Sequence, residues 1–348
     1  MTPTDEPKEH IFWIDILRGL NIILVLKWHV NIIDINTGTN HIECLQVAHF
    51  FQPIRMPLFM FISGGVLYLG RIKPDWGSVK FYKDKAIRLF IPFLFFSFVF
   101  SLWEPIVHLL SNSLDETTLP NILNSLFRCK GLAIHLWFLP VLFCFMLLFP
   151  FYKIACKNNF ALLFILIIAL ALNLLNASLF PMTSQLTITV NPLFVDKAAK
   201  YFVFFVLGII YFRFKAHFVM KNWRNLLLST IIFFISFVYL RSFPLWMSMC
   251  GILLMITLAM QLCKLSSSLF KSFRGYSFPI YLMSMPIQYL FGILLWKSPF
   301  YEERLYWLFY VLSILIGLYL PVLIAKNIEL SKYGFLKTCF GLKQNSIQ

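Results

Sequence analysis

The dominant feature of the sequence is a series of long apolar segments that follow one another almost without interruption. They lie near residues 11–35, 49–70, 87–110, 134–152, 160–180, 198–213, 225–241, 244–263, 276–296 and 305–325. Each is long enough, or nearly so, to cross a bilayer, which takes about 20 apolar residues in a helix. Backbone polar groups must be paired internally within lipid, so such segments cross as helices. The sequence therefore predicts an all-α polytopic membrane protein with about ten transmembrane helices.

Composition supports the same fold class. Apolar residues make up 59% of the 348 residues and charged residues only 13%, whereas an ordinary soluble domain is about 45–50% apolar and about 25% charged. A soluble globule of this size could not cover its surface with so few charges. The net charge of +15 is not concentrated in a basic domain, so we expect membrane lipid and no nucleic acid as a partner. Seven scattered Cys without a C-x-x-C pair predict no metal site.

The distribution of basic residues between loops predicts the orientation in the membrane. With ten spans and a cytoplasmic N-terminus, the inner loops and tails carry about three times as many Lys and Arg as the outer loops. This asymmetry is typical of a protein with both termini in the cytoplasm. The predicted organisation is a cytoplasmic tail at 1–10, a transmembrane domain at 11–326 and a second cytoplasmic tail at 327–348.

The first apolar segment carries the most informative polar residues. Arg18 and His29 are eleven residues apart, which places them on one helix face about three turns from each other. Asp15 lies one turn before Arg18 and can pair with it. Charged groups inside a span are costly and are functional candidates. The alternative is a purely structural Asp15–Arg18 pair, with His29 a satisfied core histidine.

The second segment and the following inner loop add further cations. Arg55 is a second cation within a span, and Ser63-Gly64-Gly65 permits a close approach between helices. Lys85 and Arg88 lie three residues apart at the start of the third span, where two cations together could bind phosphate. Anchoring to lipid headgroups would explain the same pair.

These motifs occur in a characteristic order along the chain. They are Asp15-x-x-Arg18-Gly19 followed by His29; Arg55-Met56-Pro57-Leu58-Phe59 with Ile62-Ser63-Gly64; Lys85-x-x-Arg88-Leu89-x-x-Pro92; and His135-Leu136-Trp137-Phe138-Leu139. The series resembles the membrane-bound acyltransferase family 3, the O-acetyltransferases that modify surface glycans, and in particular its fucose 4-O-acetylase-like branch. The resemblance runs from about residue 10 to 325 and is strongest over the first 140 residues. Later, only Phe205-x-x-Gly208 and Tyr276-Ser277-x-x-Ile280-Tyr281-Leu282 resemble the family.

The resemblance implies an enzyme that takes acetyl from cytoplasmic acetyl-CoA and delivers it to a sugar hydroxyl at the outer face, without a metal. The family's Arg, ten residues, His motif falls on Arg18 and His29, which are therefore catalytic candidates together with Asp15. Acetyl-CoA is expected to contact five cationic residues: Arg18, Arg55, Arg71, Lys85 and Arg88. His29 is expected to act as general base on the acceptor hydroxyl, with an acyl-histidine intermediate as the alternative route. The chain is expected to cross a cell membrane several times, and the expected membrane is the bacterial inner membrane.

The acceptor side is less specific. Glu104, His49 and His135 fall near outer helix ends and are candidates for binding a carbohydrate or lipid-linked glycan. Ser284 stands where relatives often carry a His after the Tyr-Leu pair of a late helix. Lys85 stands where Arg is more usual, so the positive charge is kept but the planar guanidinium is lost. A transporter or flippase for a lipid-linked glycan or small anionic substrate is the competing function. The sequence does not identify the acceptor.

Overall fold

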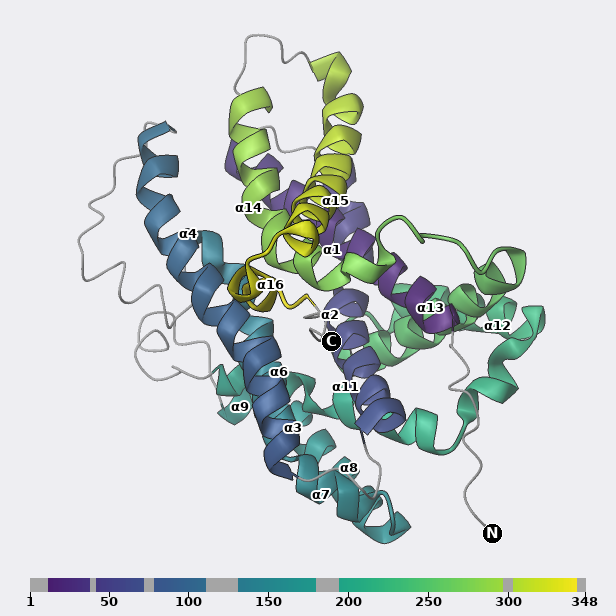
Figure 1. Ribbon diagram of the computed structural model, residues 1–348. Coiled ribbons are helices and arrows are strands. Elements are labelled where there is room, and N and C mark those ends of the chain that lie inside the picture. The colour runs from purple at the N-terminus through teal and green to yellow at the C-terminus, as the bar shows by residue number, and fades with distance from the viewer. Residues whose placement is uncertain are drawn as a thin grey trace.

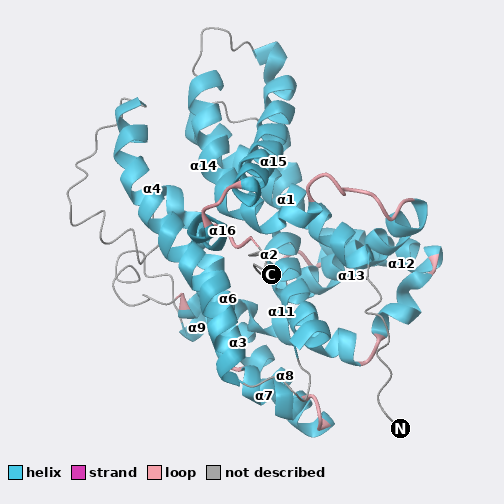
Figure 2. Cartoon of the chain, viewed as in Figure 1, coloured by secondary structure: helices cyan, strands magenta, loops and turns pink. Residues whose placement is uncertain are grey.

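A computed structural model describes residues 12–37, 42–71, 78–110, 131–179, 194–296 and 303–342. Within these ranges every regular element is a helix and there is no strand (Figure 2). The predicted all-α class is therefore confirmed. Each of the ten apolar segments of the sequence overlaps one, two or three consecutive helices.

The first half of the chain forms a long helical pair followed by shorter pieces. Its helices are α1 (Phe12–Thr37), α2 (Ile42–Arg71), α3 (Ser78–Lys85), η1 (Ala86–Phe90), α4 (Ile91–Leu110), η2 (Gly131–Trp137), α6 (Phe138–Leu147), α7 (Phe149–Ala155), α8 (Asn159–Leu174) and α9 (Asn176–Leu179). The described second half contains α11 (Val195–Arg213), η3 (Ala216–Lys221), α12 (Trp223–Tyr239), α13 (Pro244–Leu265), η4 (Arg274–Tyr276), α14 (Ser277–Trp296), η5 (Glu303–Leu305), α15 (Tyr306–Leu330) and α16 (Gly334–Cys339).

Helix α1 lies in the middle of the helical assembly. It packs against α2, α13, α14 and α15 (Figure 1), and its side chains at Ile16, Ile22 and Leu26 are fully buried. This packing buries Asn21 and His29 of α1 between helices, where a polar group in a membrane protein is least costly.

Helices α2 and α11 cross at direct backbone contact. A Cβ added to Gly64 would overlap the carbonyl oxygen of Phe205, and one added to Gly208 would overlap that of Phe61. In lipid, helices associate through close packing rather than through a hydrophobic driving force, so small residues at the crossing are required. The close approach predicted from Ser63-Gly64-Gly65 is confirmed, and it fixes the position of α2.

A widened helical turn separates α3 from α4. Residues Ala86–Phe90 form a π-helical turn, and it directly precedes Pro92. Pro92 has no N–H to donate to the carbonyl of Arg88, so the regular hydrogen-bond ladder cannot continue there. The widened turn places Lys85 at its start and Arg88 within it.

In the part of the chain that the structure describes, four helical stretches are long and apolar enough to cross a membrane: Phe50–Gly70, Val79–Leu102, Pro244–Leu265 and Tyr306–Leu330. A fifth is the bent pair Ala133–Leu147 and Phe149–Ala155, whose axes differ by 52°. Pro150 in the first turn of α7 accounts for this bend, because a proline cannot continue a helix ladder. The protein is thus a multi-pass helical membrane protein by length and composition, while the total of ten spans and the cytoplasmic termini stay predictions.

Candidate active site

The imidazole of His29 lies at the centre of a buried polar cluster. Its side chain is 6% exposed, and the ring of His135 lies edge-on to it, with ring centroids 6.1 Å apart and planes at 70°. Arg55 acts electrostatically on His29, and Gln288 lies beside the ring. Nδ1 of His29 has no hydrogen-bond partner among the described residues. We define the His29 cluster as His29, Arg55, His135 and Gln288, which come from α1, α2, η2 and α14.

Gln288 ties three helices together at this cluster. From α14 its amide nitrogen donates to the carbonyl of Leu26 on α1 at 3.3 Å and to that of Ser313 on α15 at 3.2 Å. Gly317 makes room for it, since a Cβ there would lie 2.6 Å from the Gln288 side chain. The amide oxygen Oε1 is buried without a partner among the described residues. Gln288 therefore presents a fixed acceptor next to His29.

His135 is held in place by α14. Its Nε2 lies 3.0 Å from the carbonyl oxygen of Leu282, and since a carbonyl can only accept, Nε2 carries the hydrogen. In return, the hydroxyl of Tyr281 donates to the carbonyl of His135. These reciprocal bonds lock the imidazole against rotation. In a neutral His135, a hydrogen on Nε2 leaves Nδ1 unprotonated.

The guanidinium of Arg55 is held by an aromatic ring. Its Cζ lies 3.9 Å from the ring centroid of Trp28, the residue before His29. Nε is buried, and no hydrogen-bond partner is described for it. Stacking on Trp28 positions the guanidinium without neutralising its charge. Arg55 therefore offers a positive charge and unused donors close to His29.

Arg55 also lines a large cavity, of about 850 Å³. The walls come from the first half of α2, the ends of α8 and α9, the start of α11 and the turn between α12 and α13. Lys200, Tyr201 and Arg241 line it together with Arg55. This volume lies within the range of small-molecule sites, about 300–1,000 Å³. We call it the Arg55 cavity.

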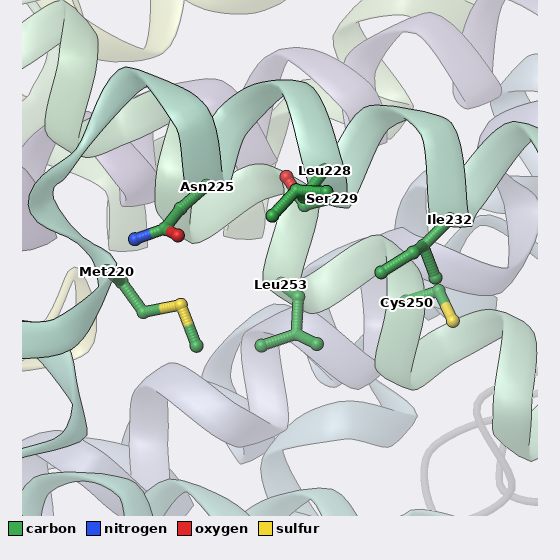
Figure 3. Close-up of a pocket in the computed structure, with 7 residues that line it drawn as sticks. All are labelled: Met220, Asn225, Leu228, Ser229, Ile232, Cys250 and Leu253. Atoms are coloured by element: carbon green, nitrogen blue, oxygen red, sulfur yellow. The ribbon is translucent and has the colours of Figure 1, made fainter.

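A second, smaller cavity lies between α12 and α13. It has a volume of about 160 Å³ and is lined mainly by apolar side chains, with Asn225 and Ser229 as polar exceptions. Figure 3 shows these side chains extending from η3, α12 and α13 toward one space. Its lining contains no charged residue and none of the predicted site residues. We assign it no chemistry.

The predicted cations on the first turns of α1 and at the turn before α4 have partners within their own helices. Arg18 donates from NH1 to the Asp15 carboxylate at 3.2 Å, as predicted, and Nε of Arg88 lies 2.9 Å from Asp84 Oδ1. The ammonium of Lys85 lies 5.5 Å from the ring centroid of Phe81. α1 is continuous from Phe12 to Thr37, so Arg18 lies about 16 Å along the axis from His29.

The structure thus assembles some of the predicted site residues and not others. It brings His29, Arg55 and His135 together, whereas Arg18 pairs with Asp15, and Lys85 and Arg88 contact α3. His135 is buried beside His29, and its role in binding the acceptor stays a prediction. The side chains of Arg71, His49 and Glu104 lie outside the described residues.

Sequence reasoning did not single out Gln288 or Asn21, and it noted Ser284 only as standing where relatives often carry a His. Gln288 is fully buried, and so are Asn21 and Ser284, whose side-chain polar atoms have no partner in the described part of the chain. A Gln within the apolar segment 276–296 was a usable signal, since polar groups inside spans mark functional positions. Asn21 and Ser284 gave a weaker signal, because such residues also occur at helix contacts with no further role.

Comparison with known proteins decides the family. A protein-family model described as "Acyltransferase domain", Acyl_transf_3, matches residues 11–326. The chain belongs to this acyltransferase family. It is accordingly a membrane acyltransferase, and the family resemblance found in the sequence is confirmed. Searches of curated proteins and of solved structures each gave no match, so the fucose 4-O-acetylase-like branch stays a prediction.

Proposed function

We propose that this acyltransferase moves acetyl from cytoplasmic acetyl-CoA to a hydroxyl group of a surface or lipid-linked carbohydrate, in a bacterial inner membrane. The observation that carries the proposal is the His29 cluster. It combines a buried imidazole with an open Nδ1 and a guanidinium without an ion-pair partner among the described residues. Buried polar groups are nearly always paired, so unpaired ones in a protein with acyltransfer activity indicate where the reactants bind.

The chemistry follows from these two groups. His29 takes the proton of the acceptor hydroxyl through an unprotonated ring nitrogen while the hydroxyl oxygen attacks the thioester carbonyl carbon. The carbonyl oxygen becomes negatively charged in the tetrahedral intermediate, and the guanidinium of Arg55 stabilises that charge. When the intermediate collapses, the C–S bond breaks and the CoA sulfur leaves as a thiolate. The imidazolium of His29 returns its proton to that sulfur, so the enzyme ends as it began.

The donor is proposed to enter from the side of Lys85 and Arg88. Both residues lie at the widened turn before α4, and Arg88 is half-exposed there. CoA phosphates would compete with Asp84 for the Arg88 guanidinium, a charge-assisted interaction. From this position the acyl arm would run past the Asp15–Arg18 pair toward His29. An arm spanning about three helical turns is needed for that path.

The acceptor is proposed to enter through the Arg55 cavity. Arg55 belongs both to the lining of this cavity and to the His29 cluster. A hydroxyl that reaches Arg55 from the cavity is therefore next to the proposed base. His135, held through Leu282 and Tyr281, forms the opposite side of the imidazole.

The direct test is acetyl-CoA consumption by the purified protein in detergent or nanodiscs, with a glycan mixture from the producing cell as acceptor. The proposal expects release of CoA thiol that depends on protein and increases with acceptor. Loss of ester-linked acetyl from one surface glycan in a deletion strain would identify the acceptor. Transport of a glycan with no release of CoA thiol would instead support the transporter function.

A further inference from the structure

The Arg55 cavity has a strongly one-sided charge. Among the described residues, its lining includes three cations, Arg55, Lys200 and Arg241, and no carboxylate. Among the residues that the structure describes, none of the three forms an ion pair. Asp196 lies near Tyr201 but is not part of the lining. Cations gathered around one cavity repel each other and attract an anion into it.

The wall that carries Lys200 is fixed by side-chain hydrogen bonds. The amide of Asn173 on α8 donates to the carbonyl of Lys200 at 2.5 Å, and that of Asn176 on α9 donates to the carbonyl of Asp196 at 2.7 Å. These bonds join the first turn of α11 to the end of the α8–α9 segment. The backbone of Lys200 is therefore held at the cavity instead of moving freely with a loop.

An aromatic surface lies within the same wall. Tyr201 lines the cavity, and its ring stacks on Trp137 with centroids 5.5 Å apart and planes at 24°. An aromatic ring offers an apolar face to the C–H groups of a sugar ring and, for Tyr, a polar edge as well. Cations and a sugar-binding aromatic face in one cavity match a sugar that bears a negative charge.

We propose that the Arg55 cavity binds an acceptor carbohydrate carrying an anionic group, a carboxylate or a phosphate. Lys200 and Arg241 bind that group, the sugar ring lies on Tyr201, and Arg55 is left to face the reacting hydroxyl. The inference rests on the proposed function in calling the ligand the acceptor. The binding of an anionic sugar itself does not depend on turnover.

The test is direct binding to the full chain in phosphatidylcholine nanodiscs, measured by calorimetry. The probes are glucuronate, glucose 1-phosphate and glucose. At least one charged sugar is expected to bind about tenfold or more tightly than glucose, as a charge-assisted contact requires. The double variant Lys200→Gln/Arg241→Gln is expected to remove that preference. The matched control Arg304→Gln neutralises an exposed cation outside the lining and should leave binding unchanged.

Several results would overturn the inference. The first is equal affinity for glucose and the charged sugars, and the second is an unchanged preference in the double variant. The third is no binding of either charged sugar up to about 10 mM, since a dissociation constant above that value corresponds to a binding free energy near the lower limit of useful binding. Nanodiscs with phosphatidylglycerol distinguish the source of the anion, since loss of sugar binding there would show a lipid-headgroup site. If charged sugars bind selectively but acetyl-CoA is not consumed, the proposed function fails and the anion site stands.

Discussion

The polar side chains near the two ends of helix α1 differ in whether they are paired. Toward the start, Arg18 is joined to Asp15 at 3.2 Å, and at the π-turn before α4 Arg88 is likewise joined to Asp84 at 2.9 Å. Toward the other end, His29 and Arg55 retain buried nitrogens with no partner among the described residues. Paired charges are stable without a ligand, whereas unpaired buried groups retain the cost of desolvation until something binds. The contrast fits the proposal that one region binds the donor and the other performs the reaction.

The largest effect is expected from His29→Gln. The variant keeps a polar side chain of similar size but has no basic nitrogen, so the rate of acetyl transfer should fall by about 10²–10⁴-fold, the usual contribution of a general base. Steady-state release of CoA thiol measures it, with size-exclusion profiles and melting temperatures showing that the variant folds. A rate within twofold of the wild type would place the reaction elsewhere.

Substitution of Arg55 tests charge stabilisation at the same end of α1. Arg55→Gln removes the guanidinium, and kcat should fall by about 10²–10³-fold, as when an oxyanion donor is removed. Arg55→Lys keeps the charge but loses the planar stacking on Trp28, so its kcat should lie between that of the wild type and that of Arg55→Gln. A change confined to KM in Arg55→Gln would mean that Arg55 binds the ground state only.

Arg88→Gln tests the donor region. Loss of one charge-assisted phosphate contact should raise KM for acetyl-CoA about tenfold and leave kcat nearly unchanged. Arg224→Gln is the matched control, because Arg224 is an exposed arginine at the start of α12. An equal change of KM in both variants would indicate a general effect of surface charge.

The smallest effect is expected from Asp15→Asn. The Arg18 side chain is 34% exposed, so the loss of its partner should cost no more than about 1 kcal/mol of stability. Melting temperature and kcat are the two measurements, and kcat is expected to stay within about threefold, since we propose that this region only positions the donor. A loss of activity as large as that of His29→Gln would contradict the distinction between paired and unpaired ends.

The predictability of the site from sequence depended on residue type. His29 and Arg55 stood out because ionisable groups in an apolar segment are rare and costly. Gln288 and Asn21 did not stand out, since only the packing of α1 against α14 and α15 shows that their amide groups are buried. His135 was a candidate because of its place near a helix end, but loop order along the chain does not reveal that η2 contacts α14.

The helical fold was largely predictable for a similar reason. Apolar segment lengths translate directly into helices in lipid, and Gly64 anticipated the α2–α11 crossing. The π-turn at Ala86–Phe90 was not anticipated, although Pro92 supplies its physical cause. Which helices surround α1 could not be predicted, because the sequence carries no information on neighbours beyond adjacent segments.

The most direct measurement is a cryo-electron microscopy structure of the full chain with a non-reactive thioether analogue of acetyl-CoA. The account predicts CoA phosphates at Lys85 and Arg88, and an acyl carbonyl carbon about 3–4 Å from an acceptor site that contacts His29. The carbonyl oxygen should point at the guanidinium of Arg55. An acyl group bound more than about 8 Å from the His29 ring, beyond any contact reaction, would contradict the central claim.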